Sequence, residues 1–179
     1  MTAIDAISKF YEKEELGNDG GAEKKIIWFK FGFIYIPMPN LASRSENLYL
    51  HDISHVVTGN DISWKGESST GSWEIGAGGW MNLWFPMILT IWSMGVGVMF
   101  YTKESYKWFQ KGKTMYNAGT VGKPLNELLP LSIEELTKTL TRPEGQENKT
   151  SFLFWATISV LFWIVPLYFI GYGIYSIFA

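Results

Sequence analysis

Two histidines and two carboxylates lie close together in this sequence and form its clearest candidate for a metal-binding motif. His51 and His55 are the only histidines, and they stand four residues apart in a segment that the spacing of apolar residues predicts to be helical. Side chains four apart share one helix face, with Cβ atoms about 5–6 Å from each other. This spacing would let both imidazoles bind one ion.

Neighbouring carboxylates could complete such a site. Asp52 lies on the flank of the same face, where it could be a third ligand, orient an imidazole or act as a catalytic base. Glu67 follows a predicted helix break at Gly59, so a neighbouring helix would bring it back to the histidines. Two imidazoles with carboxylates suit zinc, iron, manganese or cobalt better than calcium or magnesium. We therefore predict a divalent metal ion bound by His51, Asp52, His55 and Glu67, with Asp52 as the catalytic residue.

Each of these residues also has a simpler interpretation. A single histidine is usually structural or solvent-exposed, and Glu67 could be a solvated carboxylate favoured by the dipole of a helix start. Glu74 is seven residues further along the same predicted helix face. It stands at the edge of an apolar stretch, where a carboxylate is costly unless it is paired, so it is a secondary candidate for the site. Asp61 is better explained as a turn or capping residue.

The motif and its flanks resemble the ubiquinone-biosynthesis Coq-four family. The signature of that family is His-Asp-x-x-His, eleven residues and then Glu, and this sequence matches it at every position. Similar flanking segments extend the resemblance over roughly residues 40 to 142. They are Arg44–Leu50, Val56–Gly59, Gly66–Glu67, Lys111–Lys113 and Leu125–Leu140. The apolar C-terminal stretch has no counterpart that we recognise in the family.

The resemblance implies an all-α protein that binds one divalent metal, associates with a membrane and acts on a polyprenylated ring in quinone synthesis. The implied reaction removes a ring carboxyl group oxidatively and hydroxylates the same carbon. The metal would bind the carboxylate or phenolate oxygen and activate oxygen species. His51, His55 and Glu67 would be its ligands, and Asp52 a ligand or base.

Two long segments without charged residues are candidate membrane-spanning helices. Residues 75–102 and 151–179 contain no Asp, Glu, Lys or Arg, and each exceeds the roughly 20 residues that an α-helix needs to cross a bilayer. Aromatic residues lie near both ends of the second stretch, as expected at the two membrane interfaces. We predict a transmembrane helix at 151–178. The apolar helix at 78–101 spans the membrane, packs inside the domain or lies in the membrane interface.

The first apolar stretch also sets two further expectations. A cavity for an isoprenoid or acyl tail should open from the metal site between Met81 and Met99, with Gly95 and Gly97 in its wall. The alternative is that these glycines only seat a neighbouring helix. The basic residues Lys103, Lys107, Lys111 and Lys113 should lie on the cytoplasmic side. The motif would then lie outside if 75–101 spans the membrane, and inside if it does not.

Caps and breaks divide the chain into four parts. Residues 1–42 hold an amphipathic helix at 2–15, expected as a surface or interfacial flap, and an aromatic segment at 26–36 that is a hairpin or lies on a membrane. Residues 43–142 form the metal-binding region, with a capping box at Ser43 and Glu46 and a helix cap at Ser63. A linker at 143–150 precedes the transmembrane helix. The predicted fold class is all-α with one or two transmembrane helices.

Composition narrows the possible functions. The net charge of −2 and scattered basic residues give no nucleic-acid-binding surface, and the absence of cysteine excludes thiolate metal sites. We expect an integral membrane protein, in the inner membrane if bacterial. It would be a metal-dependent enzyme acting on a prenylated quinone precursor or another lipid. The alternative is a non-catalytic lipid- or quinone-binding subunit of a larger membrane complex. A hydrolase is disfavoured, because a His-Asp phosphohydrolase needs more histidines and a zinc peptidase would have Glu in place of Asp52.

Overall fold

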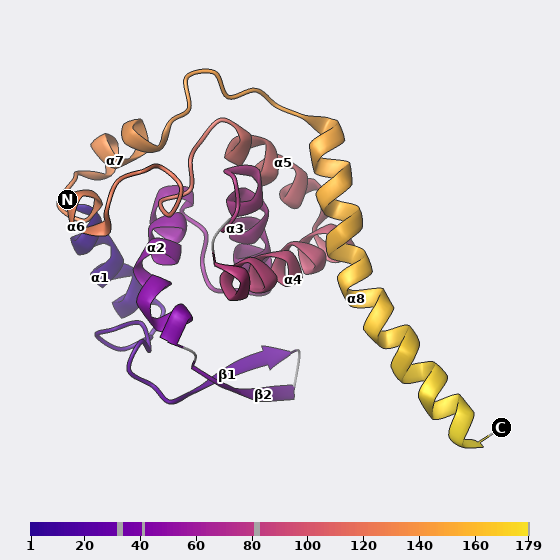
Figure 1. Ribbon diagram of the computed structural model, residues 1–179. Helices are drawn as coiled ribbons and strands as arrows, with labels where there is room; N and C mark the ends of the chain where they lie inside the picture. The colour runs from indigo at the N-terminus through magenta and orange to yellow at the C-terminus, as the bar shows by residue number, and fades with distance from the viewer. Residues whose placement is uncertain (32–33, 41, 81–82, 179) are drawn as a thin grey trace.

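The computed structural model describes residues 1–31, 34–40, 42–80 and 83–178, and helices dominate these ranges (Figure 1). The helices are α1 (Ala3–Lys13), α2 (Ala42–Thr58), α3 (Trp64–Gly76), α4 (Trp84–Phe100), α5 (Thr102–Lys113), α6 (Leu125–Leu128), α7 (Ile133–Leu140) and α8 (Lys149–Phe178). Strands β1 (Ile26–Phe31) and β2 (Ile34–Pro39) form an antiparallel hairpin that pairs Ile26 with Pro39. The predicted all-α class is confirmed, with this hairpin added to it.

The turn between α2 and α3 follows the predicted chemistry. Gly59 ends α2 with a positive φ of 72°, a conformation that costs glycine little. Asp61 accepts a hydrogen bond from the backbone nitrogen of Ser63 at 3.0 Å, and the Ser63 hydroxyl accepts one from Gly66 at 3.1 Å. Asp61 is thus a turn residue and Ser63 a helix cap, as predicted. The predicted capping box of Ser43 and Glu46 lies outside the described side chains.

Small residues allow α3 to be buried between α4 and α5. A Cβ on Gly76 would lie 2.2 Å from the carbonyl oxygen of Phe109, and one on Gly112 would lie 2.2 Å from that of Trp73. Backbones that approach this closely leave no space for side chains at those positions. The contact fixes α3, and with it the carboxylates that α3 carries.

Helix α1 belongs to the core of the domain. Ala3 and Ile7 are fully buried and Tyr11 nearly so, in one cluster with Leu136 and Leu140 of α7. The interpretation of this segment as a surface flap was wrong, because its apolar face is covered by α2 and α7.

One helix in the described ranges, α8, is long and apolar enough to cross a membrane. Its 30 residues correspond to about 45 Å. The first half lies against α4, and beyond Trp163 every residue as far as Phe178 is exposed. Helix α4 has only 17 residues and packs against α3, α5 and α8. Helix α4 thus packs within the helical domain, and α8 is the candidate membrane span among the described helices.

Candidate metal centre

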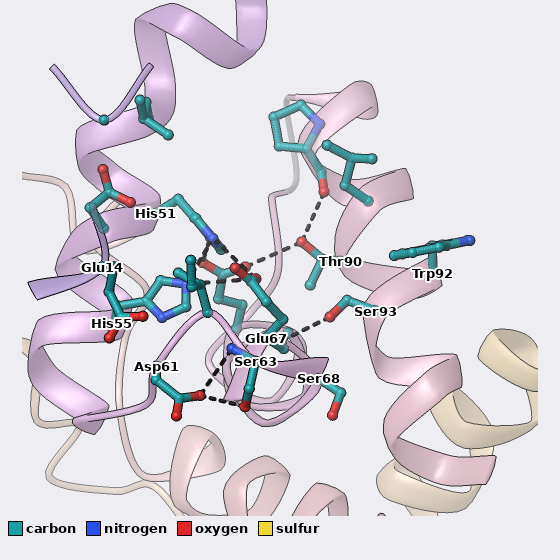
Figure 2. Close-up of a pocket in the computed structure, with 18 of the residues that line it drawn as sticks. Glu14, His51, His55, Asp61, Ser63, Glu67, Ser68, Thr90, Trp92 and Ser93 are labelled. Atoms are coloured by element: carbon teal, nitrogen blue, oxygen red, sulfur yellow. Dashed lines mark hydrogen bonds and ion pairs between the residues drawn. The ribbon is translucent and has the colours of Figure 1, made fainter. Parts of the chain in front are cut away.

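Two helices bring the three principal candidate ligands together (Figure 2). The Nε2 atoms of His51 and His55 lie 3.1 Å apart, and Glu67 Oε2 lies 3.8 Å and 3.7 Å from them. Ligand atoms with bonds of about 2.0–2.1 Å to one tetrahedral ion are separated by about 3.3 Å. These three residues could therefore hold a metal ion, and their predicted convergence is confirmed.

The opposite ring nitrogens of the histidines have hydrogen-bond acceptors. His55 Nδ1 lies 3.0 Å from the backbone carbonyl oxygen of Asn60, and His51 Nδ1 lies 2.8 Å from Glu74 Oε1. A carbonyl or carboxylate oxygen can only accept, so both Nδ1 atoms carry hydrogen. Each ring then directs its Nε2 atom toward the same point, where the two Nε2 atoms lie within hydrogen-bond distance of each other. Partners of this kind orient metal-binding histidines in general.

The electrostatics of the cluster favour a positive charge between these atoms. Burial lowers the pKa of His51, but the carboxylates of Glu74 and Glu67 outweigh it and raise the pKa well above 6.5. Burial also raises the pKa of Glu67, but His55 and His51 reverse this and lower it below its usual range. A proton on His51 supplies one positive charge, and a divalent cation would supply two.

Glu74 orients His51 and lies outside the ligand group. Its side chain is buried, and its second oxygen accepts hydrogen bonds from Trp80 Nε1 at 3.1 Å and Thr90 Oγ1 at 3.2 Å. These donors compensate for removing the carboxylate from water. The sequence indicated Glu74 as a secondary candidate, and the structure gives it a supporting position.

Asp52 points away from the ligand group. Neighbouring residues diverge by about 100° around a helix, so its carboxylate turns toward α1 and accepts a hydrogen bond from the Tyr11 hydroxyl. Burial raises the pKa of Asp52. The pKa of Tyr11 is also raised, mainly by burial and to a smaller extent by the negative charge of Asp52. The assignment of Asp52 as a metal ligand is not supported by this geometry. It does line the same cavity as His51, so its catalytic role stays a prediction.

The ligand group lines a cavity of about 860 Å³, within the usual range of about 300–1,000 Å³ for small-molecule sites. Leu89, Trp92 and Val96 of α4 contribute an apolar wall, and Trp28 of β1 lies at another side. The cavity has space for part of a lipid tail. The expected wall began at Met81, which lies outside the described residues.

The glycines of α4 serve helix packing instead of lining the cavity. A Cβ on Gly95 would lie 2.6 Å from Trp163 Cδ1 of α8, and one on Gly97 would lie 3.1 Å from the Cβ of Ser68. Met94 is fully buried in a separate core cluster. The expectation that these glycines form the wall was wrong, and the alternative that they seat neighbouring helices is confirmed.

No Lys or Arg occurs among the described residues that line the cavity. Its acidic lining residues are Glu14, Asp52, Asp61, Glu67 and Glu74. Lys13 pairs with Glu14 at 2.7 Å but does not line the cavity itself. The charged side chains of this lining thus favour a cation in the cavity.

Sequence reasoning missed several partners of the site. Tyr11, Asn60, Trp80 and Thr90 carry no pattern that would mark them, since their roles depend on contacts between separate elements. Phe10, within the predicted amphipathic helix at 2–15, stacks on the ring of His55 with centroids 5.1 Å apart. Glu74 was a secondary candidate, and the general rule that metal-binding imidazoles need an acceptor could have suggested its orienting role.

No protein-family model, curated protein or solved structure matches this chain. The resemblance to the Coq-four family therefore rests on the motif and its flanks.

Proposed function

We propose that this chain is an integral membrane protein that binds one divalent metal ion and acts on a lipid with a polar ring, as the resemblance to the Coq-four family implies. The observation that supports this most is the convergence of the two Nε2 atoms and Glu67 Oε2 on one point. Two imidazole nitrogens and a carboxylate that converge on one point would favour a cation there. The point lies in a cavity large enough for a lipid headgroup and part of its tail.

The reaction would be an oxidative decarboxylation with hydroxylation of the same ring carbon. The substrate would be a prenylated ring acid, whose carboxyl group leaves as carbon dioxide while one atom of dioxygen enters the ring as a hydroxyl group. A two-electron donor and two protons would reduce the second oxygen atom to water. The bound metal supplies Lewis-acid and oxygen-activating chemistry.

The residues of the chain would have separate roles in this reaction. His51, His55 and Glu67 would hold the ion, and Glu74 would keep His51 in place. Asp52 would accept the substrate proton at Oδ1, because Tyr11 already binds Oδ2. The apolar wall of α4 excludes water and receives the tail. Because the described lining residues include no Lys or Arg, the acidic group of the substrate would bind at the metal.

The experiment is single turnover by detergent-purified protein loaded with zinc, iron, manganese or cobalt. A prenylated ring acid labelled at the carboxyl carbon, dioxygen and a reductant are supplied, and released carbon dioxide and hydroxylated product are measured. We expect the parent to release carbon dioxide and form the hydroxylated product, and Glu67→Gln to do neither. Asp52→Asn should still bind the metal but lose turnover. Metal-dependent binding of the acid without turnover would contradict the reaction and favour a non-catalytic accessory subunit.

A further inference from the structure

We propose that the β1–β2 hairpin and the start of α4 lie in the interfacial zone of the same bilayer that receives α8, so that the cavity opens onto lipid. In Figure 1 the hairpin projects from the helical domain on the side toward which the exposed half of α8 extends. The opposite end of the domain holds α6 and α7. The two projecting elements thus define one side of the molecule.

The exposed side chains on this side suit lipid. Trp28 is 63% exposed and Ile26 53% exposed on β1, and Trp84 at the start of α4 is 70% exposed. Residues 26–39 include one charged residue, Lys30. Tryptophan with flanking basic residues is typical of the membrane–water interface. A bilayer would cover these side chains, which water would otherwise surround.

A tryptophan cluster places the cavity beside Trp163, the residue beyond which α8 is fully exposed. Trp92 of α4 stacks on Trp163 of α8 with centroids 5.1 Å apart, and Trp64 lies 5.6 Å from Trp92. Trp64 and Trp92 both line the cavity, and so does Trp28 of the hairpin. The cavity therefore extends from the metal ligands to the surface that we assign to the bilayer.

This arrangement deepens the proposed function, because a membrane-dissolved ligand could enter without crossing water. A bilayer is favoured over a second copy of the chain because the surface adjoins the apolar helix α8. The orientation in the bilayer does not depend on metal binding, because a chain that binds no metal could still have it.

The absence of cysteine allows a direct test with the full chain. Single cysteines are introduced as Trp28→Cys, Ile26→Cys, Lys138→Cys on α7 and Ile174→Cys in α8, and each is labelled with a nitroxide. The proteins are reconstituted in phosphatidylcholine vesicles with chromium oxalate on both faces. Electron paramagnetic resonance then measures collisions of the label with oxygen, which concentrates in lipid, and with chromium oxalate, which stays in water.

The proposal expects labels at 26 and 28 to lose collisions with chromium oxalate and to retain those with oxygen, as at 174, while the label at 138 collides with both. Equal chromium collisions at 28 and 138 would overturn it. Shielding at 28 from both reagents would also overturn it, because a protein contact would then cover the hairpin. Metal content measured on the same samples reports separately on the proposed function.

Discussion

Each histidine of the candidate centre uses one ring nitrogen for its own orientation and presents the other to the ligand point. The orienting partners differ, since His51 has the carboxylate of Glu74 and His55 has a backbone carbonyl. The carboxylate can be altered by substitution, whereas the carbonyl cannot. Glu74 therefore offers a way to disturb the metal site without removing a ligand.

Glu74→Gln is expected to weaken metal binding by about 10–100-fold, the usual effect of changing a partner that orients a ligand. Glu67→Gln should weaken it further, because a ligand oxygen is replaced. Metal titration against a competing chelator measures both variants. The matched control is Asp61→Asn, which changes a cavity carboxylate outside the ligand group and should leave affinity unchanged. Equal affinities for Glu74→Gln and the parent would contradict the orienting role.

The raised pKa of His51 predicts opposite pH dependences with and without metal. Burial lowers this pKa, but Glu74 and Glu67 raise it overall above 6.5, so the folded chain holds the proton more tightly than the unfolded chain. Stability from this source is present below about pH 6.5 and is lost as the pH rises through the raised pKa. A metal ion needs the neutral ring, so its stabilisation grows with pH.

The measurement is the unfolding temperature with chelator and with zinc between about pH 6 and pH 8, the range in which histidine titrates. The difference between the two curves should widen as the pH rises, and it should stay small in His51→Ala. A constant difference in the parent would show that no proton competes with the metal.

Tyr11 is expected to stabilise the fold through Asp52. Tyr11→Phe leaves the buried carboxylate without its hydroxyl donor, at a cost of about 1–3 kcal/mol. Chemical denaturation measures this loss, and metal stoichiometry should not change. The double variant with Asp52→Asn should recover part of the lost stability, because the buried charge is gone. Loss of metal from Tyr11→Phe would instead place Asp52 in the ligand group.

Among the helices, those whose ends are set by a glycine or a capping side chain could be predicted from the sequence. Gly59 and Ser63 marked the end of α2 and the start of α3, and these two helices carry the ligands. The burial of α1 and α4 could not be read in this way, because an apolar helix face does not specify what covers it. Gly95 showed the same ambiguity, since small residues suit both a cavity wall and a helix contact.

Gly95→Leu is expected to displace α8 from α4, because even a Cβ at this position would lie 2.6 Å from Trp163. Overpacking of this kind costs about 1–3 kcal/mol, and the unfolding temperature in detergent should fall. The control is Gly171→Leu in the exposed half of α8, where a Cβ would meet nothing within 4 Å. Equal unfolding temperatures for the two variants would contradict the α4–α8 contact.

At the scale of the whole molecule, the domain holds a polar ligand group on α2 and α3, an apolar cavity wall on α4 and a long apolar helix beside that wall. The sequence predicted the ligands because their spacing on α2 and the break before α3 are local. It did not place Asp52 against Tyr11 or Asn60 against His55, because those contacts depend on how α1 and the turn after α2 fold back. The cavity volume likewise depends on packing between elements.

X-ray absorption at the zinc edge, measured on the full chain purified in detergent and loaded with zinc, shows directly which atoms bind the metal. We expect one zinc per chain with two imidazoles and at least one carboxylate oxygen at about 2.0–2.2 Å. In Glu67→Gln the carboxylate signal should disappear. A spectrum without imidazole scattering, or the same spectrum from a variant carrying His51→Ala and His55→Ala, would contradict it.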